Sequence, residues 1–241
     1  MRTSGLIQVY TGNGKGKTTA ALGLALRARG AGKRVAVVFF DKGGDHYSER
    51  KILGQLGVDW FGYGMDRMDP TTNRFRFGVL SKDTAQAEQG IAKAMGLLQQ
   101  FFPIPTGAVL PLPPAGGARG GSCEARGGGG GPQPYYDLLI LDEINTVVAL
   151  GMVSEKSVER LIEMKPDALE LVLTGRTEVM RESASSRVQN EGSNTPGRPW
   201  PNGNEHQRWL SYFDRADLIT EMRLERHYFY SGVPVRAGLD Y

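Results

Sequence analysis

The sequence of 241 residues is poor in several features that define whole classes of protein. It has one cysteine, Cys123, which can form neither an internal disulfide nor a cysteine-based metal site, and an unpaired cysteine is typical of a reducing compartment. No apolar run approaches the roughly 18–20 residues that a membrane helix needs, so we expect no membrane partner. The first apolar segment begins at Leu6, which leaves no room for a signal or transit peptide. We therefore expect a cytoplasmic protein.

Charge of one sign is also scarce. The chain carries 29 Lys and Arg against 26 Asp and Glu, a formal net charge of +3, and its basic residues form no dense cluster. Nucleic-acid-binding domains usually gather basic residues into a patch or stripe. We therefore expect no nucleic-acid partner.

Glycine and proline are unevenly distributed. Residues 103–134 hold ten of the 33 Gly and seven of the 13 Pro, a composition that cannot bury enough apolar surface to offset chain entropy. Residues 177–213 are rich in Ser, Asn, Gly and Pro, and we expect no core face in their second half. We interpret both segments as disordered insertions into a single domain that spans residues 1–241.

Apolar segments alternate with helical patterns along the rest of the chain. Short, continuous apolar runs are typical of buried parallel strands, and their alternation with helices indicates an α/β fold. Strands are predicted at 6–11, 34–40, 58–61, 137–141, 169–174 and 217–222. Helices are predicted at 18–29, 49–56, 83–102 and 156–164.

A glycine-rich loop, TGNGKGKTT, joins the first strand to the first helix at residues 11–19. It is a variant of the phosphate-binding pattern G-x-x-x-x-G-K-[ST]. Thr11 stands where the pattern has its first glycine, and the nearest glycine, Gly12, lies one position later. Glycines at 12, 14 and 16 allow the backbone N–H groups to approach an anion at the helix N-terminus. Lys17 would add a charge on the phosphates, and the Thr18 hydroxyl could ligate Mg²⁺. The alternative is a glycine turn that only connects strand to helix. Together with the alternation of elements, the loop predicts a P-loop NTPase (RecA-like) three-layer sandwich with a mainly parallel central sheet.

Two acidic residues, Asp142 and Glu143, follow the apolar run Leu138–Leu141, as in a Walker B element. Mg²⁺ prefers carboxylate oxygens beside substrate phosphates, and ligands of parallel sheets bind at the carboxyl ends of the strands. The two motifs should therefore meet at one site. Alternatively, the two carboxylates cap the next helix.

Two arginines are further candidates for phosphate contacts. Arg176 follows the strand at 169–174, where its guanidinium could bind phosphate oxygens bidentately; the alternative is a surface arginine in a turn. Arg27 lies on the first predicted helix, where a solvated role is the alternative.

The reaction is not determined by these motifs, since P-loops serve kinases, ATPases, GTPases and transferases alike. A kinase of a small molecule and a non-catalytic, ATP-gated switch protein are the alternatives to a transferase.

Four blocks of sequence together resemble the CobA/CobO/BtuR-type corrinoid adenosyltransferases. They are GNGKGKTT with the helix after it, YDLLILDEIN at 136–145, LVLTGR at 171–176 and the tail 216–241. The displaced glycine is this family's own pattern. The resemblance covers roughly 1–102, 135–176 and 214–241.

The resemblance implies transfer of the 5′-deoxyadenosyl group of ATP to the cobalt of a Co(I) corrinoid, with release of triphosphate. Cob(I)alamin and cob(I)yrinic acid a,c-diamide are the implied corrinoids, in cobalamin biosynthesis or salvage. It further implies a homodimer and, as electron donor, a flavoprotein reductant.

The resemblance and the motifs assign roles to particular residues. Lys17 and Arg176 would stabilise the leaving triphosphate. The predicted ligands of Mg²⁺ are Thr18, Asp142 and Glu143. The predicted ATP site comprises Gly12, Asn13, Gly14, Lys15, Gly16, Lys17, Thr18, Thr19, Arg27 and Arg176.

The corrinoid side departs from the family pattern. Gly64–Arg67 stands where many members have the aromatic segment G-F-x-W. Candidates for contacts with the corrinoid are Trp60, Tyr63, Met65, Arg67 and, in the tail, His227. Packing in the core or in a loop is the alternative for Trp60 and Tyr63.

Overall fold

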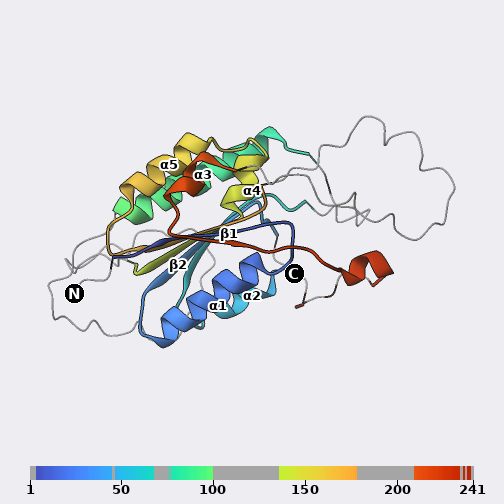
Figure 1. Cartoon of the computed structure of the whole chain (residues 1–241), viewed down its shortest axis with the longest axis horizontal. Coiled ribbons are helices and arrows are strands. Elements are labelled where there is room, and N and C mark those ends of the chain that lie inside the picture. Colours follow the sequence, from blue (N-terminus) through green and yellow to red (C-terminus); the bar gives the residue numbers. More distant parts are fainter. Residues whose placement is uncertain are drawn as a thin grey trace.

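The computed structural model describes residues 4–44, 47–67, 76, 78–99, 136–177, 209–233, 236 and 238–239. Figure 1 shows a central sheet between two layers of helices. The predicted insertion at 103–134, with Cys123, lies outside the described residues, as does most of 177–213.

Six parallel strands form the sheet, in the order β3-β2-β4-β5-β1-β6. Their bounds are β1 Ile7–Thr11, β2 Val35–Phe40, β3 Asp59–Tyr63, β4 Leu138–Asp142, β5 Glu170–Thr174 and β6 Leu218–Glu221. Every residue of β2 and β4 is buried, as expected of central parallel strands that are covered on both faces. The α/β class and the parallel sheet are thus confirmed.

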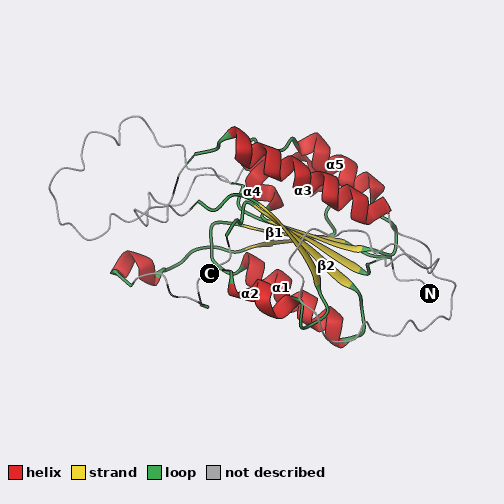
Figure 2. Ribbon diagram, turned by 180° about the vertical axis from the view of Figure 1, so that it is seen from behind, coloured by secondary structure: helices red, strands yellow, loops and turns green. Residues whose placement is uncertain are grey.

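The helices cover both faces of the sheet, as Figure 2 shows from behind. Helices α1 (Lys17–Gly30) and α2 (Ser48–Leu53) lie on one face. The other face carries α3 (Ser81–Gln99), α4 (Ile144–Ala149), α5 (Glu155–Met164) and the 3-10 helix η2 (Ser211–Arg215). A second 3-10 helix, η3, spans Tyr228–Ser231 in the tail. This is the three-layer arrangement that the loop and the alternation of elements predict.

Alternation along β2 divides the core between the two faces. Val37 and Phe39 pack with Ala21 and Ala25 of α1, whereas Val38 and Phe40 join the larger cluster beneath α3 and α5. Small residues on α1 let this helix lie close to the sheet, and α1 carries the glycine-rich loop at its N-terminus. The loop is thus fixed to the rigid centre of the fold.

The end of the segment 177–213 belongs to the core, which corrects the expectation that its second half has no core face. Leu210, Tyr212 and Phe213 are buried, and the Tyr212 hydroxyl donates to Asn145 Oδ1 at 2.8 Å. Burial here depends on α4 and α5, which lie about 50–70 residues earlier in the chain. No sequence pattern within residues 177–213 indicates this burial.

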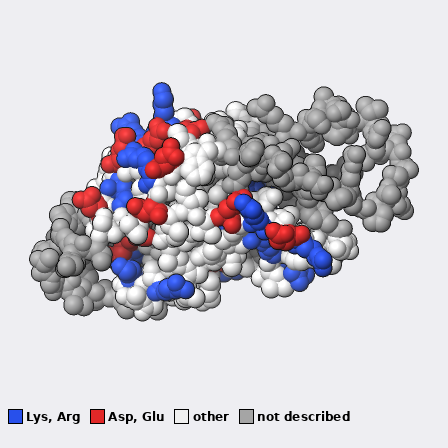
Figure 3. Space-filling view, viewed as in Figure 1, with Lys and Arg blue, Asp and Glu red and all other residues white. Residues whose placement is uncertain are grey.

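The surface seen in Figure 3 carries Lys and Arg interspersed with Asp and Glu over the described residues. Within the same part of the chain, no helix combines the length and the apolar character needed to cross a membrane. The expectation that nucleic acid is not a partner stays a prediction.

Candidate functional site

The glycine-rich loop, residues 12–16, connects β1 to α1 at the carboxyl edge of the sheet. Gly12 has φ +98° and Gly16, the N-cap of α1, has φ +115°, in the region that favours glycine. A Cβ atom at Gly12 would lie 2.3 Å from the carbonyl oxygen of Met222. Glycine therefore serves two needs here: it permits the left-handed turn, and it lets the C-terminal segment approach the loop.

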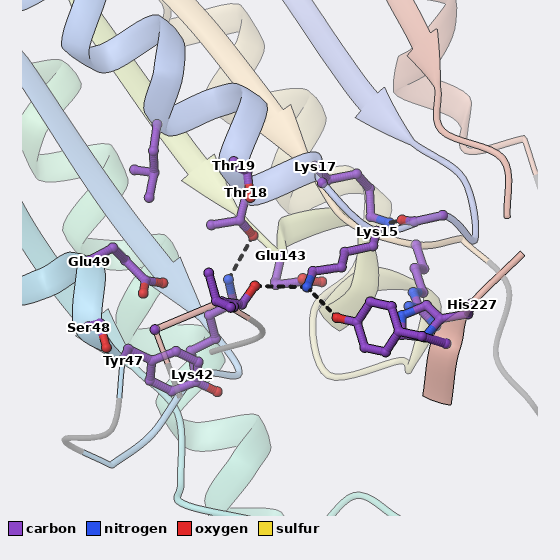
Figure 4. Close-up of a pocket in the computed structure, with 17 residues that line it drawn as sticks. Lys15, Lys17, Thr18, Thr19, Lys42, Tyr47, Ser48, Glu49, Glu143 and His227 are labelled. Atoms are coloured by element: carbon purple, nitrogen blue, oxygen red, sulfur yellow. Dashed lines mark hydrogen bonds between the residues drawn. The ribbon is translucent and has the colours of Figure 1, made fainter. Parts of the chain in front are cut away.

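A cavity of about 760 Å³ opens over the N-terminus of α1. One wall is the glycine-rich loop, a second is formed by residues that come after β2 in the chain, and a third is the C-terminal tail (Figure 4). Glu143 and Arg176 lie at the ends of β4 and β5, so parallel strands bring both to this edge. The lining residues are Gly14, Lys15, Gly16, Lys17, Thr18, Thr19, Leu22, Lys42, Tyr47, Ser48, Glu49, Glu143, Arg176, His227, Tyr228, Gly238 and Leu239.

Lys17 is the buried cation of the loop. Its Nζ donates to the carbonyl oxygens of Gly12 and Gly14, both at 2.7 Å. Burial lowers the pKa of Lys17 to about 8, and repulsion by Arg176 and Lys42 adds to this shift. The ammonium is thus poorly solvated and held at the loop, where an anion would compensate it.

Asp142 lies behind the cavity and does not line it. Its carboxylate is 1% exposed, and its Oδ1 accepts from the Thr174 hydroxyl at 2.7 Å. Its Oδ2 accepts from Thr18 Oγ1 at 3.2 Å and from Lys42 Nζ at 2.6 Å. The glycine-rich loop and the acidic residues after β4 therefore meet at one place, as the predicted parallel sheet led us to expect.

Glu143 faces the cavity. It has φ +63°, an unusual conformation for a residue with a side chain, and the Thr146 hydroxyl donates to its carboxylate at 2.5 Å. Glu143 occupies the N-cap position of α4, but its side chain makes no capping hydrogen bond. Orientation toward the cavity, and not helix capping, is what this backbone conformation achieves.

The oxygen donors at this edge fit Mg²⁺. Thr18, Asp142 and Glu143 supply a hydroxyl and carboxylates, which are hard ligands. In the described residues no three or more His, Cys, Asp or Glu side chains gather as a metal site. Magnesium is often bound by one or two carboxylates together with substrate phosphates, and this donor set suits that mode.

Lys42 is a site residue that the sequence reading missed. Its Nζ bonds Asp142 and also lies 2.8 Å from Thr18 Oγ1. Burial by itself would lower the pKa of Lys42, but the carboxylates of Asp142 and Glu143 raise it above its ordinary value. The signal was present, since Lys42 follows a buried strand by two residues and so lies at the edge where ligands bind.

Arg176 lies in the cavity wall and Arg27 does not. Arg176 is exposed, its backbone N–H donates to Thr146 Oγ1 at 2.9 Å, and Gly175 before it has φ +132°. Arg27 is exposed in the last turn of α1. Ten residues beyond Lys17, it lies about 15 Å along the helix. Arg27 therefore lies away from the cavity wall, and its contact with ATP stays a prediction.

Three further loop residues contact the C-terminal tail. Gly14 N–H donates to Met222 O at 2.7 Å, and Asn13 Oδ1 accepts from Leu224 N–H at 2.9 Å. Lys15 Nζ lies 3.0 Å from the Tyr228 hydroxyl and 2.8 Å from Leu239 O. Neither Gly12 nor Asn13 lines the cavity. The Asn13 side chain anchors the tail, and the contact of Asn13 with triphosphate stays a prediction.

The tail brings His227 to the cavity, as the sequence led us to expect. Its ring lies 4.5 Å from the ring of Tyr228, and both residues line the wall opposite α2. The contact of His227 with a corrinoid stays a prediction.

The other corrinoid candidates lie outside the cavity wall. Trp60 packs on the α1 side of the sheet and Tyr63 on the α3 side, because alternate strand residues face opposite ways. Arg67 is buried and binds Asp41 Oδ1 through Nε at 2.9 Å and Nη2 at 2.6 Å. Met65 is 37% exposed. Trp60 and Tyr63 thus pack against the sheet and Arg67 forms an ion pair, and none of the three lines the cavity.

Comparison with known proteins identifies a family. The family model described as ATP:corrinoid adenosyltransferase BtuR/CobO/CobP matches residues 3–102 and 132–185. A Salmonella typhimurium protein named corrinoid adenosyltransferase CobA is 28% identical, over 98% of this chain and 86% of its own. The Escherichia coli K12 corrinoid adenosyltransferase is 27% identical with the same coverage. That of Pseudomonas aeruginosa is 25% identical, over 98% of this chain and 84% of its own.

Proposed function

Because this chain belongs to the ATP:corrinoid adenosyltransferase family and is a transferase, we propose that it joins the 5′-deoxyadenosyl group of ATP to the cobalt of a Co(I) corrinoid. In this reaction the cobalt electron pair forms the Co–C5′ bond. The C5′–O bond breaks, and triphosphate leaves with the electron pair of that C5′–O bond. The protein then needs no nucleophile of its own, since the substrate supplies it.

The observation that carries the proposal is the convergence of cations on one cavity. Lys17, Lys42 and Arg176 reach it from the starts or ends of α1, β2 and β5. A triphosphate that departs intact develops charge along its whole length, and fixed cations in a poorly solvated site stabilise such charge strongly. Three cations that line one cavity therefore suit the departure of an intact triphosphate.

The residues of the loop hold and orient the nucleotide in this proposal. Backbone N–H groups at the N-terminus of α1 would face the phosphates, and Lys17 leaves its two loop carbonyls to bind them. Magnesium, held by Thr18 and Glu143 with Asp142 behind them, would supply Lewis-acid charge on the triphosphate. Orientation of C5′ toward cobalt contributes the rest, because fixing two reactants lowers the entropic part of the barrier.

The substrate side rests on the family and on the tail. We propose cob(I)alamin or cob(I)yrinic acid a,c-diamide as the corrinoid, in cobalamin biosynthesis or salvage. His227 and Tyr228 present aromatic rings to the cavity opposite α2 and are our candidates for facing it. We further propose that the enzyme acts as a cytoplasmic homodimer and that a flavoprotein supplies the electron for Co(I).

The test is a turnover assay with chemically reduced cobalamin and Mg-ATP, repeated with the a,c-diamide precursor. We expect Co(I) absorbance to fall in proportion to inorganic triphosphate released, measured by ³¹P NMR. The relative kcat/KM of the two corrinoids then identifies the preferred one. Release of ADP with a phosphorylated product would point to a kinase, and ATP binding without turnover would point to a switch; either would overturn the proposal.

A further inference from the structure

The position expected for a divalent cation already holds a side-chain cation. Lys42 Nζ lies 2.8 Å from Thr18 Oγ1 and 2.6 Å from Asp142 Oδ2, two of the three groups that fit Mg²⁺. The dashed line between Thr18 and Lys42 in Figure 4 marks one of these contacts. One ammonium therefore satisfies both oxygens at once.

The fold holds Lys42 in this place. Arg50 of α2 donates to the carbonyl oxygens of Lys42 and, at 3.0 Å, of Gly44. Its guanidinium lies 4.6 Å from the ring centre of Tyr47, 5.1 Å from that of Phe39 and 5.5 Å from that of Trp60. Such stacking of a cation on aromatic faces is favourable. Arg50 thus fixes the backbone from which the Lys42 side chain reaches Asp142, and it gives Trp60 a structural role.

Asp142 needs a cation for a physical reason. Its carboxylate is 1% exposed, and Lys42 is 13% exposed. A buried carboxylate without a partner is costly, so proteins pair it or bind it to a metal. The Thr174 hydroxyl donates to one oxygen, which satisfies a hydrogen bond but leaves the charge. Lys42 supplies the missing charge.

We propose that Lys42 is a resident cation of the magnesium position, which neutralises Asp142 in the nucleotide-free protein and competes with a divalent cation for Asp142 and Thr18. This inference rests on the proposed function for the role of the metal, but not for the contacts themselves. Because Lys42 also lines the cavity, an ammonium displaced from Asp142 remains beside the triphosphate and can stabilise it. The metal alone then binds weakly, and it binds well only together with the charge of ATP.

The test uses Mn²⁺ alone with the full-length, nucleotide-free protein, and measures unbound Mn²⁺ by electron paramagnetic resonance. Lys42→Met should tighten Mn²⁺ binding by about tenfold or more, because a unit charge about 4 Å away repels a divalent ion even through water. Lys42→Arg keeps the charge and should bind Mn²⁺ as weakly as the wild type. Lys33→Met, which removes an exposed charge at the opposite end of β2, should change nothing.

An unchanged or weaker Mn²⁺ affinity in Lys42→Met would overturn the inference, as would an equal gain in Lys42→Arg. Asp142→Asn should weaken Mn²⁺ binding, and this result stands whether or not Lys42 competes. Turnover of wild-type protein with corrinoid tests the proposed function separately, so the two failures are distinguishable.

The wild-type protein supplies a second readout if Lys42→Met does not fold. Acetylation of the Lys42 amine by acetic anhydride, followed by peptide mass spectrometry, should be slow without metal and several-fold faster at saturating Mn²⁺. Lys33 serves as the internal reference. A Lys42 rate that is unaffected or lowered by Mn²⁺ would overturn the competition.

Discussion

Lys17 illustrates how a single side chain is prepared for an anion. Its ammonium bonds two carbonyl oxygens of its own loop, and its lowered pKa reports how little water solvates it. Phosphate oxygens can replace these carbonyls and add a full charge interaction, which makes the exchange favourable.

Lys17→Ala should therefore weaken ATP binding. Hydrogen bonds to charged groups contribute about 1.5–3 kcal/mol, so we expect a loss of roughly tenfold to 150-fold in affinity, measured by isothermal titration calorimetry with Mg-ATP. Lys33→Ala is the matched control, because it removes an exposed lysine far from the loop. An affinity of Lys17→Ala within threefold of the wild type would show that this loop does not hold the triphosphate.

The predicted site residues that do not line the cavity share a cause. Motif spacing locates groups in the glycine-rich loop and just after strands, and so it brought Thr18, Glu143 and Arg176 to the cavity wall. Motif spacing does not show where a side chain points when its residue lies far from the motif. Arg27 is at the far end of its helix, and Arg67 is bound to Asp41 across a 26-residue separation. Such a pairing is not visible in one sequence.

At the scale of elements, the strands and the short helix α2 were predictable, whereas the short helix α4 was not. Continuous apolar runs such as VAVVFF can only be buried on both faces, so β2 and β4 were found within one residue of their bounds. Helix α4 has six residues, too few to show a period. Leu210, Tyr212 and Phe213 are buried only because Asn145 and α5 receive them, which is a property of the assembled fold.

The start of α3 depends on one buried ion pair. Asp83 accepts from Leu80 N–H at 2.8 Å and binds both terminal nitrogens of Arg76, at 2.8 and 2.9 Å. The hydrogen bonds from Arg76 hold the pKa of Asp83 below its usual range. The Asp83 carboxylate is 1% exposed and the Arg76 side chain 29% exposed, so Arg76 covers the carboxylate and supplies its counter-charge.

Asp83→Asn should destabilise the protein by about 1.5–3 kcal/mol at pH 7, the contribution of hydrogen bonds to a charged group. A lowered folded-state pKa gives stability that is complete above the unfolded pKa of about 3.9 and is lost as pH falls toward the folded value. The difference between variant and wild type should thus shrink below about pH 4, as measured by urea unfolding from pH 7 to pH 3. Asp167→Asn, at an exposed position, is the control; a difference that is constant over this range would contradict the account.

For the whole molecule, we propose that residues 103–134 are an insertion that the six-stranded sheet of the described residues does not need. Leu98, near the end of α3, and Tyr136, just before β4, line one small hollow together. The two ends of the intervening segment therefore lie close, and a short connection can span them. Loop closure depends only weakly on length.

Deletion of residues 103–134 should leave the free energy of unfolding within about 1 kcal/mol of the wild-type value and the turnover number nearly unchanged. Urea unfolding and the corrinoid assay measure these two quantities. A deletion variant that does not fold would show that the segment contributes to the core, and one that folds without activity would place it in the site.

The proposed reaction bonds C5′ of ATP to cobalt at the cavity over α1. The direct measurement uses ATP labelled with ¹³C at C5′, mixed with chemically reduced cobalamin and the protein. We expect the ¹³C signal to move to a cobalt-bound methylene of the corrinoid, one equivalent for each triphosphate released. Lys17→Ala should abolish or strongly slow this transfer. Label that stays in ADP or another nucleotide while phosphate is transferred or released would contradict it.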